Sequence, residues 1–204
     1  NRNRLQRVNS EPTMAKLRPE QLNAALAKNL APIYIVTGEE PLLIQETCDS
    51  IRAAARKAGF IERDLYHCEA QFDWSQVLAS ANSLSLFADK KIIELRIPNG
   101  KPGDKGSKVL QEYAQSPSAD NLLLIITEKL DKDASKSKWF VALEQQGVHI
   151  QHWPVTPENL PHWIGQRLKQ AGLQADGNAV DLLASRIEGN LLAAVQEIEK
   201  LKLL

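Results

Sequence analysis

The chain lacks most of the features that would place it in a specialised class of protein. Its two cysteines, Cys48 and Cys68, are not closely spaced and follow no signal peptide, which predicts reduced thiols in a cytoplasmic protein. No apolar run is long enough to cross a bilayer, and the longest, residues 122–126, suits a buried strand. The 25 basic and 25 acidic side chains cancel, so any contact with DNA must be local and no membrane partner is expected.

A phosphate-binding loop is also missing from the position where an open α/β sheet would carry one. The first apolar run that suits a buried strand, residues 32–36, is followed closely by Gly38, Glu39, Glu40 and Pro41. A P-loop needs further glycines, a lysine that neutralises the phosphates, and a serine or threonine that holds magnesium. Here two carboxylates stand in place of the cation and would repel a triphosphate. The sequence therefore predicts a degenerate nucleotide site and no cofactor.

Neither a metal site nor a catalytic set is evident. His149 and His152 have H-x-x-H spacing, but strand residues three apart point to opposite faces, and no cysteine pair completes a zinc set. Asp131 and Asp133 lie in a mixed-charge loop that needs no role beyond solubility. We therefore predict no metal and no catalytic residue.

Strand-like and helical patterns alternate over most of the chain. The expected strands are residues 32–36, 64–68, 91–97, 121–127 and 148–152. The expected helices are one that starts at Pro19 and others at 42–59, 74–82, 108–114 and 136–146, with a turn-rich loop at 98–107. Parallel pairing of such strands requires crossovers that place helices on both faces. The predicted fold class is a doubly wound α/β sheet.

From residue 154 onward only helical patterns remain. Thr156 and Asp176 predict helix N-caps, and Asn190 opens a third helix. We therefore expect an α/β domain over residues 14–153 and a helical domain over residues 154–204.

The two ends of the chain carry separate expectations. Residues 1–13 have no apolar periodicity and precede the single methionine, so we expect them to be disordered or derived from cloning. The last residues, 201–204, read as an apolar helix without a breaker, which predicts that the natural protein continues.

Lysines gather in two loops, and the first contains Lys101, Lys105 and Lys108. Such side chains suit contacts with phosphates, although acidic residues lie between them. A DNA-binding role for these lysines stays open. The four tryptophans lack accompanying basic residues and are expected to lie in the core instead of forming a stacking platform: Trp74, Trp139, Trp153 and Trp163.

The segment 83–91 places two large apolar side chains, Leu86 and Phe87, next to each other just before a strand. Neighbouring positions on a helix lie about 100° apart, so the two side chains do not easily face one core. Two interpretations remain: the segment ends a helix over its own core, or it presents one or both side chains to a partner.

Several motifs together resemble the delta subunit of the bacterial DNA polymerase III clamp loader, and the likeness runs from residue 18 to residue 204. They are PEQL at 19–22, GEEPLLIQE at 38–46, SLFA at 85–88, DNLLLI at 120–125, WFVAL at 139–143 and EGNLLA at 188–193. The resemblance implies a RecA-like (AAA+-type) parallel sheet domain, a small all-helical lid domain, and a C-terminal collar domain that this chain lacks. It also implies a lost P-loop and, at Leu191 and Leu192, the loss of the phosphate-sensing arginine of active relatives.

The resemblance further implies a function. In this family the delta subunit binds and opens the sliding clamp, the beta subunit, so that the clamp can be loaded onto primed DNA. The matching clamp-binding residues are Leu86 and Phe87, framed by Ser83, Leu84, Ser85 and Ala88.

The wider assembly is implied in the same way. Motor and delta-prime subunits would bind through the collar, and ATP would be used in those neighbours. This chain would be a non-catalytic part of a nucleotidyltransferase holoenzyme in the bacterial cytoplasm, near the nucleoid. The alternatives are a P-loop-like NTPase or a DNA-binding module with a degenerate nucleotide site.

Overall fold

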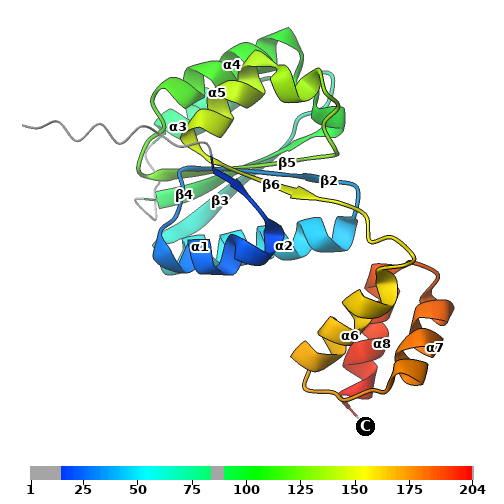
Figure 1. Cartoon of the computed structure of the whole chain (residues 1–204). Helices are drawn as coiled ribbons and strands as arrows, with labels where there is room; N and C mark the ends of the chain where they lie inside the picture. Colours follow the sequence, from blue (N-terminus) through cyan, green and yellow to red (C-terminus); the bar gives the residue numbers. More distant parts are fainter. Residues whose placement is uncertain (1–14, 84–89, 204) are drawn as a thin grey trace, which may run out of the picture. The chain divides into compact units, whose positions relative to one another are not determined.

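Six parallel strands form one sheet in the first part of the chain (Figure 1). The computed structural model describes residues 15–83 and 90–203. The chain divides into two units, one ending at His152 and one beginning at Trp153. The strands are β1 (Ala15–Leu17), β2 (Ile33–Gly38), β3 (Phe60–His67), β4 (Lys90–Ile97), β5 (Asn121–Thr127) and β6 (Val148–His152), in the order β1-β6-β2-β5-β4-β3. Every pairing is parallel.

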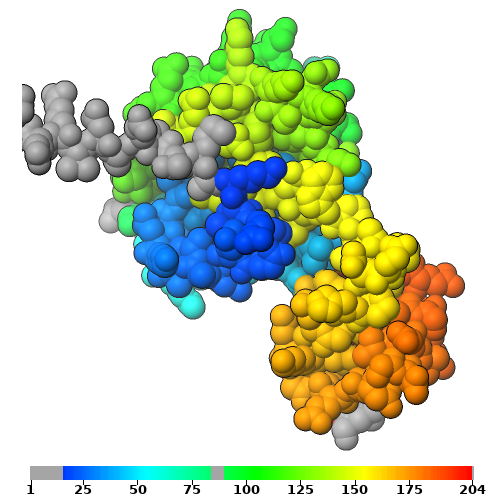
Figure 2. Space-filling model, in the orientation of Figure 1, coloured from blue at the N-terminus to red at the C-terminus, as the bar shows by residue number. Residues whose placement is uncertain are grey.

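Helices cover both faces of this sheet. They are α1 (Leu22–Lys28), α2 (Pro41–Lys57), α3 (Ser75–Asn82), α4 (Gly103–Gln115) and α5 (Lys138–Gln146). Figure 1 shows α1 and α2 on one face and α3, α4 and α5 on the other. The space-filling view likewise separates the blue side chains of α1 from the green side chains of α4 (Figure 2). The predicted doubly wound α/β fold is confirmed.

The two faces bury separate apolar cores, because successive residues of a strand point in opposite directions. In β2, Ile33 and Ile35 pack with residues of α3, α4 and α5, whereas Tyr34 and Val36 pack with residues of α1 and α2. All six residues of β2 are buried. The continuous apolar run therefore marks a central strand, as the sequence predicted.

Two predicted details of the sheet domain are wrong. A sixth strand, β1, was not predicted, because it has only three residues and becomes a strand by pairing with β6. Helix α4 begins at Gly103, not near Lys108. Residues 103–107 of the expected loop at 98–107 are therefore helical. The start of α4 was missed because glycines are typical of loops. Gly103 has φ 71, and Gly106 is needed because a Cβ there would overlap the Trp74 ring.

The second unit contains three helices, α6 (Leu160–Gln170), α7 (Gly177–Ile187) and α8 (Leu191–Leu201). Asp176 and Asn190 cap α7 and α8 by accepting hydrogen bonds from Ala179 N at 2.8 Å and Ala193 N at 3.0 Å, which confirms two predicted caps. Thr156 is not a cap, because α6 begins only at Leu160. The buried side chains of this unit are Leu160, Ile164, Leu168, Ile187, Leu191, Ala194 and Ile198.

The tryptophans divide into two groups. Trp74 and Trp139 are buried, as predicted, whereas Trp163 is half-buried and lies 4.7 Å from the Arg167 guanidinium. The prediction for Trp153 is wrong: this side chain is 58% exposed, because it follows β6 in the connection to α6. None of the helices within the described ranges is long and apolar enough to cross a bilayer.

Candidate functional site

A polar network lies where the start of β4 meets the middle of β3 and the end of α3. Lys91 is 5% exposed, and its ammonium group donates to Ser83 Oγ at 2.7 Å and lies 3.4 Å from Asp64 Oδ2. Ser80 Oγ donates to the same carboxylate oxygen of Asp64 at 2.5 Å. A buried ammonium group is costly unless it is paired. Lys91 therefore fixes the position of Ser83 relative to β4.

A second set of bonds joins the end of α3 to β5. Asn121 Nδ2 donates to the Ala81 carbonyl at 2.8 Å, and Ser83 Oγ donates to the Ser80 carbonyl at 3.0 Å. Asn121 is itself buried and pairs with Lys91 in the sheet register. The chain is thus held on both sides of residues 84–89, at Ser83 and at β4.

Of the predicted clamp-binding residues, only Ser83 falls within the described chain. Ser83 is exposed and lies at the amino-terminal edge of the sheet. Leu84, Ser85, Leu86, Phe87 and Ala88 lie outside the described residues. Their role stays a prediction.

The four residues predicted to form a degenerate nucleotide loop come together at the opposite, carboxyl-terminal edge. Gly38 ends β2, and Pro41 begins α2 without an N–H group. The Glu40 carboxylate accepts a hydrogen bond from the Leu42 N–H at 3.3 Å, and Glu39 lies 3.8 Å from the Lys129 ammonium group. A carboxylate therefore caps the helix end at which a P-loop would hold phosphate.

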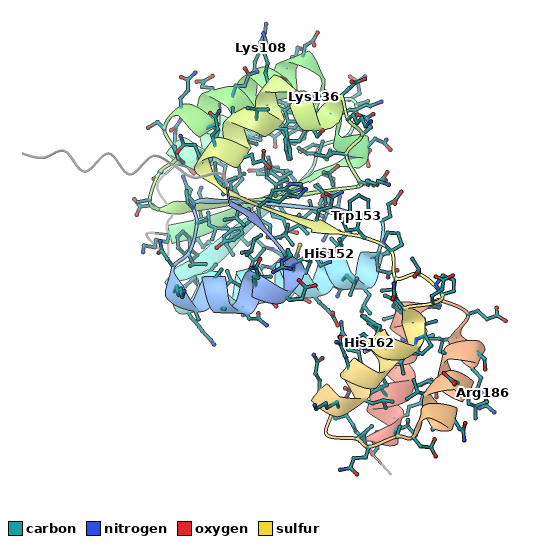
Figure 3. The ribbon with its side chains drawn as sticks, viewed as in Figure 1. Lys108, Lys136, His152, Trp153, His162 and Arg186 are labelled. Atoms are coloured by element: carbon teal, nitrogen blue, oxygen red, sulfur yellow. The ribbon has the colours of Figure 1, made fainter. Side chains whose placement is uncertain are left out.

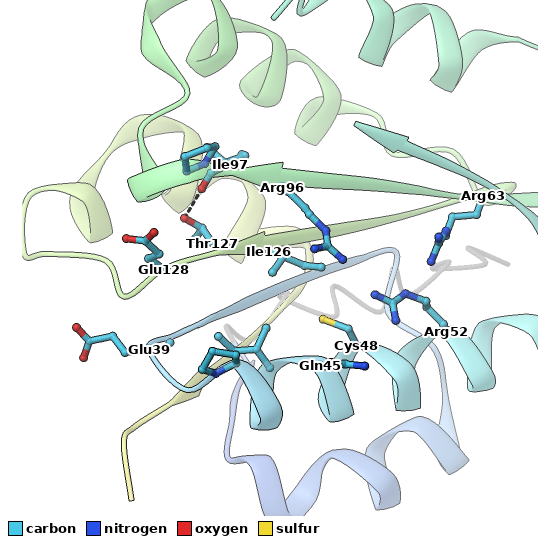
Figure 4. A pocket seen from close by; sticks show the side chains of 14 residues that line it. Glu39, Gln45, Cys48, Arg52, Arg63, Arg96, Ile97, Ile126, Thr127 and Glu128 are labelled. Carbon is cyan, nitrogen blue, oxygen red and sulfur yellow. Dashed lines mark hydrogen bonds between the residues drawn. The ribbon is translucent and has the colours of Figure 1, made fainter. Parts of the chain in front are cut away.

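A pocket of about 830 Å³ extends from this loop along α2 (Figure 4). Its lining includes Arg52, Arg63 and Arg96, which sequence reasoning missed. The available signal was Glu94, a carboxylate within the apolar run of β4, because such a group needs a cationic partner when it is buried. Cys48 also lines the pocket, and burial raises its thiol pKa to about 12, so it is an unreactive neutral group.

The two strand histidines point to opposite faces of the sheet, as predicted. His149 Nε2 lies 2.9 Å from Thr37 Oγ1 and its ring packs against Phe140 of α5, whereas His152 Nε2 lies 2.7 Å from Thr47 Oγ1 of α2. Figure 3 shows His152 on the α2 side of the sheet. Burial lowers the pKa of both imidazoles, that of His149 to about 4. In the described part of the chain no group of three potential ligands could hold a metal ion.

The buried His149 makes stability depend on pH. The Glu144 carboxylate lies 3.5 Å from Nδ1 and favours the charged ring, but burial, assisted by Lys16, outweighs it and lowers the pKa. Because the unfolded chain binds the proton more readily, the stabilisation is present above the ordinary histidine pKa and is lost as pH falls towards 4. Between pH 7 and pH 5 we expect His149 to remove about 2 kcal/mol from the free energy of unfolding.

Urea denaturation at several pH values tests this expectation. His149→Gln should flatten the pH dependence relative to the parent chain, whereas His162→Gln should leave it unchanged, because His162 is exposed. Equal slopes for the parent and His149→Gln would contradict the expectation.

The three lysines considered for DNA contact gather at one end of α4. Lys101 precedes the helix, Lys105 and Lys108 lie on it, and all three are exposed. Figure 3 shows Lys108 projecting from α4 away from the sheet. Asp104 adds an exposed negative charge among them. Contact with DNA stays a prediction.

Comparisons with known proteins agree with one another. The family model for "DNA polymerase III, delta subunit" matches residues 34–152. The chain is 38% identical over 194 residues to DNA polymerase III subunit delta of Haemophilus influenzae, and 34% identical over 191 residues to that of Escherichia coli. Each alignment covers 94% of this chain and 56% of the relative. The chain thus spans about half the length of the curated relatives it matches.

Solved structures share the fold. The Bacillus subtilis DNA clamp loader delta protein matches with a TM-score of 0.69 at 21% identity, covering 90% of this chain and 57% of that one. A RuvB structure from Thermotoga maritima matches with a TM-score of 0.53 at 13% identity, covering 89% of this chain and 58% of that one. The expected RecA-like α/β fold followed by helices is confirmed.

Proposed function

Because the chain belongs to the DNA polymerase III delta-subunit family, we propose that it binds the sliding clamp and opens it for loading onto primed DNA. Leu86 and Phe87 insert into an apolar pocket on the clamp, framed by Ser83, Leu84, Ser85 and Ala88. Burial of a leucine or a phenylalanine contributes roughly 2–3 kcal/mol, and such anchors are common among interface hot spots.

The observation that carries this proposal is the network of Lys91, Ser83 and Asp64, which holds the chain on both sides of residues 84–89. A segment whose ends are fixed loses less conformational freedom when it binds than a segment with free ends. The network therefore supports the proposal that residues 84–89 are anchored at both ends, so that Leu86 and Phe87 lose less conformational freedom on binding.

Opening of the clamp follows from differential binding. A ligand shifts a closed ring towards an open one only by the difference between its affinities for the two states. We propose that Leu86 and Phe87 bind the open clamp more tightly, so that binding energy from this chain offsets part of the strain of opening.

No bond chemistry is assigned to this chain. The Glu40 carboxylate already caps the helix end where an NTPase would bind phosphate, which favours an interaction subunit over the NTPase alternative. ATP would be used by motor subunits, which would bind, with the delta-prime subunit, through a collar domain. Primed DNA would be contacted in that assembly.

Replacement of Lys91 tests the role of the network. Lys91→Met keeps the length of the buried side chain but removes its bonds to Ser83 and Asp64. Asp64 is 39% exposed and keeps its bond from Ser80, so we expect a stability loss of only about 1 kcal/mol. Clamp affinity should fall about fivefold or more, because the segment is less preorganised.

Calorimetric titration with purified sliding clamp measures this effect. Lys57→Met removes an exposed lysine from the end of α2 and serves as the matched control, with the parent affinity expected. If Lys91→Met binds the clamp as tightly as Lys57→Met does, the network has no part in binding.

A further inference from the structure

Three arginines from three different elements converge on one buried carboxylate, Glu94. Figure 4 shows the three arginine side chains at one end of the pocket. Glu94 of β4 is fully buried. Arg52 of α2 holds it with two bonds, Nε–Oε2 at 3.0 Å and Nη2–Oε1 at 3.2 Å. Arg63 of β3 and Arg96 of β4 approach it less closely, at 3.6 Å and 3.5 Å. Glu94 thus orients all three guanidinium groups towards one end of the pocket.

The cluster has more positive charge than its structural role requires. The two bonds from Arg52 already satisfy the charge of Glu94, and Asp49 pairs with Arg52 at 2.5 Å. Three guanidinium groups against two carboxylates leave one net positive charge. Like charges repel at short range, and the one acidic partner that the described residues offer to the two further arginines is Glu94, which Arg52 already binds.

The two outer arginines have donors available for a ligand. Their side chains are 43% and 48% exposed, whereas that of Arg52 is 18% exposed. A guanidinium group has five N–H donors, and the long contacts of Arg63 and Arg96 with Glu94 use few of them. Within the described ranges, Glu94 is the only acidic partner of either side chain.

The surroundings leave this cluster accessible. Arg63 lies on the same face of the edge strand β3 as Leu65, which is 38% exposed. The acidic residues Glu39 and Glu128 line the opposite end of the pocket. An anion would therefore be attracted to the arginine end only.

We propose that Arg63 and Arg96, oriented by Glu94 and Arg52, form a binding site for a phosphate group. Arginine matches phosphate oxygens with two parallel donors, and a site of fixed guanidinium groups loses little freedom on binding. The phosphate would belong either to a nucleotide or to the backbone of a nucleic acid strand. This site lies on the face of the sheet that α2 covers, beside β3 and β4, and does not depend on Leu86 and Phe87.

Titration of the 204-residue chain with pyrophosphate, followed through the arginine Nε–Hε signals in NMR, tests the proposal. We expect saturable shifts at Arg63 and Arg96. The double variant Arg63→Gln, Arg96→Gln should bind about tenfold or more weakly, because each lost group removes charge-assisted hydrogen bonds. It keeps Arg52 against Glu94 and should stay folded. The control, Arg56→Gln with Lys57→Gln, removes two exposed charges from the end of α2 and should stay within about twofold of the parent.

Two further titrations identify the source of the phosphate. ATP without magnesium represents a nucleotide, and a ten-nucleotide single-stranded DNA represents a nucleic acid backbone. Tighter binding of one than of the other, lost in the arginine double variant, assigns the site to that source. The proposal is overturned if none of the three probes saturates, or if the double variant binds them as tightly as the control does.

Discussion

Replacing Leu86 and Phe87 together with alanine is expected to abolish measurable clamp binding while the chain stays folded. Each side chain would contribute roughly 2–3 kcal/mol when it is buried in an apolar pocket. The loss of both corresponds to about a thousandfold or greater reduction in affinity. Calorimetry with purified sliding clamp measures it, and each single variant should retain an intermediate affinity.

A matched control separates this effect from a general loss of apolar surface. Leu182 and Leu192 are 56% and 53% exposed in the second unit, so Leu182→Ala with Leu192→Ala removes two apolar side chains from a different surface. Its clamp affinity should equal that of the parent, and circular dichroism should show that all variants are folded. Unchanged affinity in the Leu86, Phe87 variant would remove the proposed clamp-binding role.

The strands could be predicted from the sequence wherever burial determines which residue types occur. Residues 32–36 and 121–127 are apolar throughout because strands β2 and β5 are central and covered on both faces. Asp176 and Asn190 marked helix starts because their side chains replace missing backbone acceptors. Apolar runs and N-cap residues involve only residues that are close together in the chain, so one sequence is enough to identify them.

Features created by tertiary contact gave no such signal. β1 is a strand only because β6 lies beside it, and the glycines of α4 read as a loop although Gly106 lies against Trp74. Trp153 was expected in the core because no basic residues accompany the tryptophans, but its side chain is exposed. These contacts join residues that are far apart in the chain, so the local sequence does not indicate them.

The two candidate sites also differ in how far they could be predicted from the sequence. Gly38 to Pro41 are consecutive, so their meeting at the start of α2 was predictable. The arginine cluster joins α2, β3 and β4, and its geometry depends on sheet register, which pairs Leu65 with Glu94 and His67 with Arg96. Glu94 within an apolar run signalled that a partner was needed, but it did not identify Arg52, which lies 42 residues away.

Glu94 supports the largest stability effect that we expect. Glu94→Gln keeps the size of the side chain but removes the charge that Arg52, Arg63 and Arg96 face. Arg52, only 18% exposed, would keep its charge with a weaker acceptor, and the three guanidinium groups would repel one another. Loss of one partner from a buried ion pair costs about 3–5 kcal/mol, so urea denaturation should show a loss of about 3 kcal/mol or more in the free energy of unfolding.

Two variants test whether that loss comes from uncompensated charge. Glu112→Gln removes an exposed carboxylate from α4 and should change stability by less than about 0.5 kcal/mol. Arg52→Met in the Glu94→Gln background should recover part of the loss, because replacing both partners of a buried pair is far less costly than replacing one. If Glu94→Gln alone unfolds at the parent's urea concentration, Glu94 is not needed to compensate the arginines. If Arg52→Met lowers stability further, the loss arises from packing instead of charge.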